Sequence, residues 1–199
     1  MLPEKIFLRD RNPTLVLAWR EVFAEIEPVD ASDADFFDHP ADAMVSPTNS
    51  FGIMEGGLDL AIRDRIGGDI QEKVQEVILR DYHGEIPVGN AEVVPTENDT
   101  WPHLVVAPTM RVPESVSQTL NAYLAFRSCL LAVKRFNENH GKPQIGSLLV
   151  PGLATGVGRM DPYRCAVQMR IAYNYLSRPT RIPSYDEIHT IHRKLLSAS

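Results

Sequence analysis

The stretch that decides the fold is residues 44–59, which read Met-Val-Ser-Pro-Thr-Asn-Ser-Phe-Gly-Ile-Met-Glu-Gly-Gly-Leu-Asp. A short apolar segment, Ala43 to Val45, runs into polar turn residues, and a glycine pair then precedes a new apolar segment. This order predicts a strand, a loop and the start of a helix. Such a junction directs backbone N–H groups at whatever lies beyond the carboxyl end of the strand, which suits an anion.

Two polar side chains flank this junction. Asn49 can hold hydroxyl groups, and Asp59 can accept or transfer a proton. The alternative is an ordinary turn with helix-capping groups, because glycines near a helix start are common and do not by themselves identify a binding site.

A second stretch, residues 145–162, repeats the pattern. An apolar strand from Leu148 to Val150 leads into a glycine-rich loop, Ala154 to Arg159. A helix should follow, with Asp161 as its N-cap and Pro162 at its first position. Two such loops on one sheet face each other across a crevice at the strand ends, where open α/β sheets bind ligands. A diphosphate is the ligand that two glycine loops suit best.

The bulk composition indicates one globular domain over residues 1–199. The chain is 44% hydrophobic and 23% charged, with a net charge of −6 and no basic run. A nucleic-acid partner is therefore not expected. An anionic ligand remains compatible with this charge, because backbone N–H groups and helix dipoles bind phosphate without basic side chains.

Targeting and redox signals point to the cytoplasm. No apolar run approaches the ~20 residues of a membrane span, so no membrane partner is expected. Glu4 and Asp10 interrupt any apolar segment near the start, which is unlike a signal peptide. Cys129 and Cys165 have apolar neighbours and are interpreted as reduced core residues, as in a cytosolic protein.

Strands alternate with helices along most of the chain. Periodicity and capping residues predict a three-layer α/β/α fold with a mixed, largely parallel sheet. Residues 33–40 are acidic, aromatic and turn-like. The expected strands are 6–8, 27–31, 42–45, 91–94, 104–107 and 148–150. The expected helices are 13–23, 58–66, 69–82, 114–139 (opened by Pro113 and ended by 141–143), 162–176 and 184–196.

The two loops and their spacing resemble the macro domain, the ADP-ribose-binding family, over about residues 27–176. The family's first loop runs from Val-Asn-Ala-Ala-Asn to a glycine run and Val-Asp, which is similar to residues 45–49 followed by 56–59. The spacing from Asn49 to Asp59 matches that of the family's hydrolase branch. The second loop, Ser-Thr-Gly-Val-Tyr-Gly-Phe in the family, resembles residues 154–160.

This resemblance implies a role for each matched residue. Asp35 would accept a hydrogen bond from the adenine amino group, although Asp33 and Asp38 compete for that role. Phe36 would either line the adenine pocket or belong to the core. The diphosphate and the distal ribose would contact Gly56, Gly57, Leu58, Ala154, Thr155, Gly156, Val157, Gly158, Arg159 and Met160.

The resemblance assigns the chemistry to Asn49 and Asp59. Asn49 would hold the distal ribose hydroxyls, and Asp59 would orient or deprotonate a water molecule. The alternative for Asp59 is a helix N-terminal acid that interacts with the helix dipole. In either case a carboxylate at a helix start should have its charged form favoured, which suits a base more than an acid.

The sequence departs from the family pattern in several places. Met54 and Glu55 replace two glycines of the first loop, Ser46 replaces its first asparagine, and Gly158 and Met160 replace aromatic residues of the second. The family's late strand is missing, so the aromatic residue that often packs on adenine is not assigned. A proline-bearing linker and a final helix stand in its place, and we expect this helix to cover the sheet edge that the missing strand leaves.

The resemblance implies an ADP-ribosyl hydrolase that removes mono-ADP-ribose from acidic side chains, or acetyl from O-acetyl-ADP-ribose. The expected partner is ADP-ribose or an ADP-ribosylated protein, with no cofactor. A non-catalytic ADP-ribose reader and an ADP-ribose 1″-phosphate phosphatase are the alternatives. His189 and His192 lie three residues apart on the last predicted helix without nearby partners, so no metal site is assigned. The N-terminal strand and helix and the C-terminal helix are additions to the family pattern.

Overall fold

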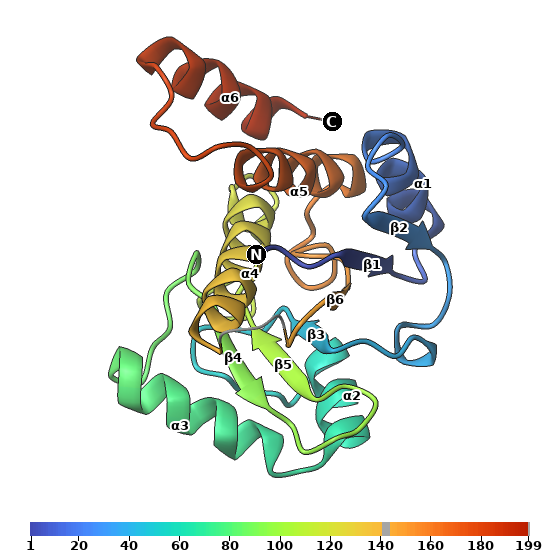
Figure 1. Cartoon of the computed structure of the whole chain (residues 1–199), viewed down its shortest axis with the longest axis vertical. Coiled ribbons are helices and arrows are strands. Elements are labelled where there is room, and N and C mark those ends of the chain that lie inside the picture. Colours follow the sequence, from blue (N-terminus) through green and yellow to red (C-terminus); the bar gives the residue numbers. More distant parts are fainter. Residues whose placement is uncertain (141–143, 199) are drawn as a thin grey trace.

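The structure is a computed structural model that describes residues 1–140 and 144–198. Its centre is a six-stranded sheet of order β2-β1-β6-β3-β5-β4 (Figure 1). All neighbouring strands are parallel except β4, which runs antiparallel to β5. The predicted mixed, largely parallel sheet is confirmed. The strands are β1 (Lys5–Arg9), β2 (Val29–Ser32), β3 (Ala43–Ser46), β4 (Glu92–Pro95), β5 (His103–Val106) and β6 (Ser147–Val150).

Helices cover both faces of the sheet, as expected for three α/β/α layers (Figure 1). Central strands are mostly apolar because each contributes to two cores: Val45 points into the core beneath α1, α4 and α5, whereas Met44 points into the core beneath α2 and α3. The helices are α1 (Pro13–Val22), α2 (Gly57–Ile66), α3 (Ile70–Tyr82), α4 (Asn121–Asn139), α5 (Pro162–Leu176) and α6 (Tyr185–Ser197), with a short 3₁₀ turn η1 (Phe36–Asp38).

Local capping explains where several helices begin. The side chains of Asn12, Asp161 and Ser184 accept hydrogen bonds from backbone N–H groups in the first turns of α1, α5 and α6, which confirms the predicted cap at Asp161. Asp69 stands at the predicted start of α3, but its carboxylate pairs with Lys73 at 2.9 Å and caps no backbone group.

Strand β1 occupies the place beside β6. It pairs in parallel with β2 on one side and β6 on the other, so Ile6 lies opposite both Val29 and Leu148. The edge strands of the sheet are consequently β2 and β4. The expectation that the C-terminal helix covers an open sheet edge is therefore wrong, because the N-terminal strand already satisfies the hydrogen-bonding groups of β6.

Helix α6 instead forms an extra layer outside α5 (Figure 1). Leu195 is 4% exposed and packs with Val167 and Ile171 of α5. Gln168 Nε2 donates to the Leu195 carbonyl over 3.0 Å, and Arg164 Nε donates to the Ala198 carbonyl over 3.0 Å. The last helix is thus attached by a small apolar cluster and by side-chain bonds to its final carbonyl groups.

The predicted start of the long helix is also wrong. Helix α4 begins at Asn121 rather than at 114, and residues 113–120 form turns instead. The Val116 N–H donates to the Gly158 carbonyl over 2.8 Å, so this segment supports the second glycine loop instead of extending the helix. The expected helix end at 141–143 lies outside the described residues.

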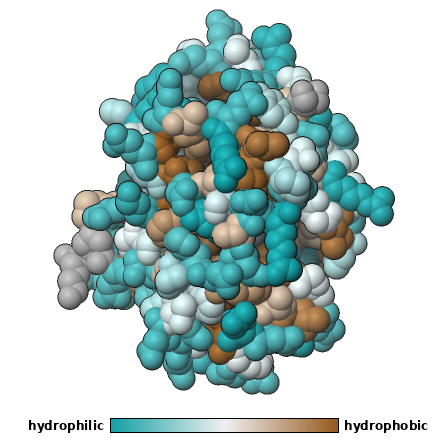
Figure 2. All heavy atoms as spheres, turned by 90° about the vertical axis from the view of Figure 1, so that its right-hand side faces the viewer, coloured by the Kyte–Doolittle hydropathy of each residue, from teal (hydrophilic) through white to brown (hydrophobic). Residues whose placement is uncertain are grey.

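The surface shows hydrophobic side chains as separated patches among hydrophilic ones on the face in Figure 2. Within residues 1–140 and 144–198, no helix combines the length and apolarity that a membrane crossing requires. Cys129 and Cys165 are buried as free thiols, which confirms their assignment to the core.

The packing of α6 predicts unequal effects for two adjacent leucines. Leu195→Ala should lower the free energy of unfolding by about 2 kcal/mol, because it removes most of a buried side chain from a small cluster. Leu196→Ala is the matched control, since Leu196 is 38% exposed and its loss should cost less than about 0.5 kcal/mol. Urea unfolding of both variants measures the difference. Equal effects would contradict the packing described for α6.

Candidate functional site

A cavity of about 670 Å³ opens at the carboxyl ends of the central strands. Four segments form its walls: the turn after β1, the loop after β3 with the first turn of α2, residues 109–113, and the loop after β6. This is the place where open α/β sheets bind ligands. The predicted site residues that line it are Asn49, Gly56, Gly57, Leu58, Asp59, Ala154, Thr155, Gly156, Val157 and Gly158.

Asn49 lines the cavity, but its side-chain amide also organises its own loop. Its Oδ1 accepts from the N–H groups of Phe51 (3.0 Å) and Ile53 (3.4 Å), and its Nδ2 donates to the Ile53 carbonyl over 2.8 Å. Gly52 completes the turn at φ +63°, where a Cβ would lie 2.7 Å from Val74 Cγ1. One amide hydrogen of Asn49 is left for a ligand.

Asp59 is the chemically distinctive side chain of the cavity. It is the third residue of α2, and its Oδ1 accepts a hydrogen bond from Ser46 Oγ over 2.6 Å. Burial raises the pKa of Asp59 to about 6, and the Ser46 hydrogen bond acts in the opposite direction. The prediction that the charged form of Asp59 is favoured is wrong, because partial removal of the carboxylate from water favours its neutral form and outweighs the Ser46 hydrogen bond.

The first turn of α2 presents its backbone to the cavity. The helix begins at Gly57 with no side-chain cap on its N-terminus, and Gly57 itself has φ +57°. The first N–H groups of a helix have no intrahelical acceptor, and they carry the positive end of the helix dipole. In the described parts of the chain, the charged side chains that line the cavity are Asp10, Glu55 and Asp59. An anion would therefore have to be held by backbone groups.

The second glycine loop has the geometry of such an anion-binding loop. Ala154 and Arg159 at its two ends adopt left-handed conformations, with φ of 63° and 53°. Within the described residues, the N–H groups of Gly156, Val157 and Gly158 donate to no protein acceptor. A Cβ on Gly158 would lie 2.4 Å from the Ala154 carbonyl oxygen, so the loop can close only with glycine there.

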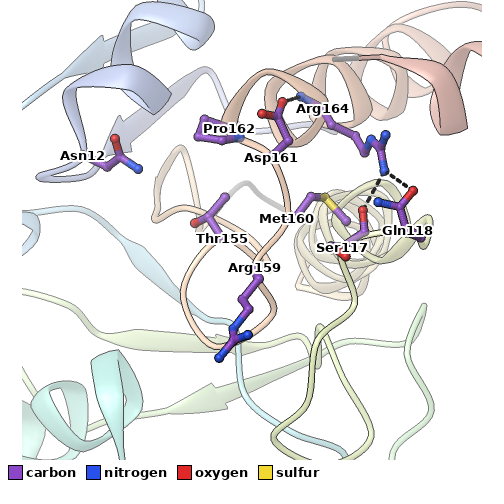
Figure 3. Close-up of a pocket in the computed structure, with 9 residues that line it drawn as sticks. All are labelled: Asn12, Ser117, Gln118, Thr155, Arg159, Met160, Asp161, Pro162 and Arg164. Atoms are coloured by element: carbon purple, nitrogen blue, oxygen red, sulfur yellow. Dashed lines mark hydrogen bonds between the residues drawn. The ribbon is translucent and has the colours of Figure 1, made fainter.

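Arg159 and Met160 face a neighbouring cavity of about 420 Å³ instead of the first one (Figure 3). The two cavities share Asn12 and Thr155 as lining residues. In Figure 3, the Arg159 side chain points downward, away from Arg164. The Arg164 Nη1 atom donates to the Ser117 carbonyl over 2.7 Å. The structure therefore separates these two predicted ligand contacts from the others.

Asp35 and Phe36 do not line either cavity. Asp35 caps η1 by accepting from the Phe37 N–H over 2.9 Å, and it also pairs with Arg11. These two hydrogen bonds, the backbone one first, lower the pKa of Asp35. Phe36 is buried in the core and packs edge-on against Phe37, with ring centroids 5.3 Å apart. Of the two interpretations of Phe36, the structure supports the one that assigns it to the core.

The cavity residues that were not predicted include Asp10 and Asn12. They lie in the turn after β1, where Asp10 accepts from the Asn12 N–H (2.8 Å) and from the Gly152 N–H (3.1 Å) of the second loop. The signal in the sequence was a polar turn directly after a strand. It could be assigned to the site only once β1 was known to lie beside β6.

Comparisons with known proteins agree with this geometry. A protein of Aquifex aeolicus without a described function is 32% identical over 118 residues, which cover 59% of this chain and 64% of that relative, so the match spans less than two thirds of its length. The structure is similar to the macrodomain of Mycobacterium tuberculosis DarG, with a TM-score of 0.58, 22% identity, and 73% of this chain and 89% of that chain covered.

A second solved structure is a mutant macrodomain of Oceanobacillus iheyensis with ADPR. It has a TM-score of 0.56 and 16% identity, and the match covers 78% of this chain and 84% of that chain. At these identities the structural likeness concerns the fold. The model of the Macro domain family matches residues 45–169, more than half of the sequence, and includes both glycine loops. The chain therefore belongs to the macro domain family.

Proposed function

We propose that this protein binds ADP-ribose in the larger cavity and hydrolyses mono-ADP-ribose from acidic side chains of proteins, or acetyl from O-acetyl-ADP-ribose. Support for the ligand comes from the Oceanobacillus iheyensis macrodomain, whose structure was solved with ADPR. Further support is the pair of backbone N–H arrays on opposite walls of one cavity. Such arrays bind a diphosphate without basic side chains.

The proposed pose follows the cavity walls. The diphosphate lies between the first turn of α2 and the N–H groups of residues 156–158. The distal ribose lies between Asn49, which has one amide hydrogen to donate, and Asp59. The adenine lies toward η1, where Asp35 accepts from its amino group. In this pose the Asp35 carboxylate accepts hydrogen bonds from both the Arg11 side chain and the adenine amino group.

The observation that carries the hydrolase proposal is the half-buried carboxylate of Asp59 in the cavity wall. A carboxyl group whose pKa is about 6 is mostly ionised at neutral pH but holds a proton well, which suits a general base. Asp59 takes a proton from water as the water oxygen bonds to the anomeric carbon. The carbon–oxygen bond to the acyl group breaks, and the electron pair leaves with the carboxylate of the modified side chain.

For O-acetyl-ADP-ribose, the same water would attack the acetyl carbonyl carbon. The bond from that carbon to the ribose oxygen then breaks, acetate is released, and the ribose oxygen takes up a proton. In both reactions the bond cleaved belongs to an ester, which is labile enough that positioning and one proton acceptor supply much of the catalysis.

The second candidate function is a non-catalytic ADP-ribose reader. It is favoured by Asn49, whose amide is mostly engaged in its own loop, and by the exposed Glu55 on the cavity wall. Glu55 stands where the family's first loop has glycine, so this loop departs from the family pattern on which the hydrolase proposal relies. A reader would bind ADP-ribose with the same backbone groups but would not need Asp59.

The Asp59→Asn variant should separate these two functions. It keeps the shape of the side chain and removes the proton acceptor, so we expect turnover to fall by roughly 10²–10⁴-fold. Calorimetric titration with ADP-ribose should give a Kd within about threefold of the wild type. Asp64→Asn is the matched control, because Asp64 is an exposed acid of the same helix. Wild-type protein that binds ADP-ribose but turns over no modified protein would support the reader.

The proposed mechanism also predicts a pH dependence. The base is active as the carboxylate, so kcat should rise about tenfold per pH unit below pH 6 and level off above it, because the pKa of Asp59 is about 6. Steady-state rates from pH 4.5 to 8.5 measure this limb. A profile that falls as pH rises through 6 would mean that Asp59 acts as an acid.

The raised pKa predicts a cost in stability. The folded state binds the proton of Asp59 more tightly than the unfolded chain, so stability falls as pH rises from the unfolded pKa of 3.8 through about 6. Asp59→Asn removes this cost and should raise the free energy of unfolding by roughly 1–3 kcal/mol at pH 7.5. The gain should shrink at pH 4.5. Denaturant titrations at the two pH values test it, and a pH-independent difference would contradict it.

A further inference from the structure

Ser46 is the last residue of β3, and its backbone is fixed by the sheet. The Ala107 N–H donates to its carbonyl over 3.1 Å, and the residue is 1% exposed. Ser46 does not line the cavity. A polar side chain at this depth requires a partner, and the partner of its hydroxyl is the Asp59 carboxylate, 2.6 Å away.

The hydrogen bond engages one oxygen of Asp59. Oδ1 accepts from Ser46, whereas Oδ2 has no hydrogen-bond partner among the described residues. Asp59 is nevertheless a lining residue of the cavity. A carboxylate fixed through one oxygen has a defined plane, so its second oxygen keeps a fixed direction for accepting a proton.

The geometry points to Ser46 as a positioning residue that fixes the Asp59 carboxylate through Oδ1 and leaves Oδ2 to meet water and the distal ribose. This inference rests on the proposed role of Asp59. It concerns a residue that touches no ligand and that stands where the family's first loop usually has asparagine. The strand end, which the sheet holds rigidly, would thereby orient a side chain of the neighbouring helix.

The electrostatic surroundings of Asp59 leave the hydroxyl as its specific partner. Burial and the Ser46 hydrogen bond are the causes of its pKa shift, and no neighbouring charge is among them. The charged groups on the elements around it are Asp10 and Glu55 in the cavity wall, Arg63, Asp64 and Arg65 in α2, and Glu72, Lys73, Glu76, Arg80 and Asp81 in α3.

The test is Ser46→Ala in the full chain, with Asp59 titrated directly by NMR of ¹³C-labelled aspartate carboxyl groups. The Asp59 signal is assigned by its loss in Asp59→Asn. Without the hydroxyl, the pKa of Asp59 should rise by roughly one unit above the wild-type value. At pH 7, kcat should fall about tenfold, because the base is both less ionised and less well oriented. The Kd for ADP-ribose should stay within about threefold.

Two further variants keep the result interpretable. Ser46→Thr retains the hydroxyl and should restore both the pKa and kcat, which separates positioning from a packing defect. Ser50→Ala removes another serine that is 1% exposed, in the loop that follows β3, and should change neither. An Asp59 pKa in Ser46→Ala equal to that of the wild type would overturn the inference. A wild-type protein without turnover would overturn the hydrolase proposal instead, and the NMR titration would still decide the role of Ser46.

Discussion

The placement of the half-buried Asp59 carboxylate against the end of β3 is the constraint around which the site is arranged. Strand β3 lies between β6 and β5 with both faces covered, so the chain must turn as soon as it leaves the sheet. Asn49 and Gly52 make that turn, and the uncapped start of α2 then returns to the strand end. The hydrogen bond from the Ser46 hydroxyl to the Asp59 carboxylate links the end of β3 to the first turn of α2.

The cavity combines acidic side chains with a polypeptide backbone that favours anions. Three carboxyl groups line it, yet both glycine loops present N–H groups without protein acceptors. Backbone donors lie at fixed positions, so selectivity for a diphosphate would come from shape more than from charge. The acids discourage anions that do not fit this shape, because repulsion is relieved only where backbone groups contact the ligand directly.

The sequence was sufficient for the layers, the strands and both glycine loops, because strands of uniform hydrophobicity and helix caps such as Asp161 are local signals. It was insufficient where distant segments decide the outcome. One neighbour of β6 is β1, more than a hundred residues away, and the Asp10 turn joined the cavity for that reason. Val116 packs against the second loop instead of entering a helix, and burial raises the pKa of Asp59 although the residue stands at a helix start. In each case a tertiary contact outweighed a correct local preference.

The pairing of β1 with β6 also affects how the chain acquires its structure. Residues 5–8 can pair with residues 147–150 only after that later segment has been synthesised. The pairing of β1 with β2, in contrast, needs only one local crossover. During synthesis on the ribosome, β1 and α1 emerge early with one strand edge exposed for the time taken to make about 140 residues. Such non-local closure slows folding and leaves an edge open to wrong partners. The glycine loop after β6 acquires its neighbour Asp10 at that same late step. The binding cavity is therefore assembled among the last features of the fold.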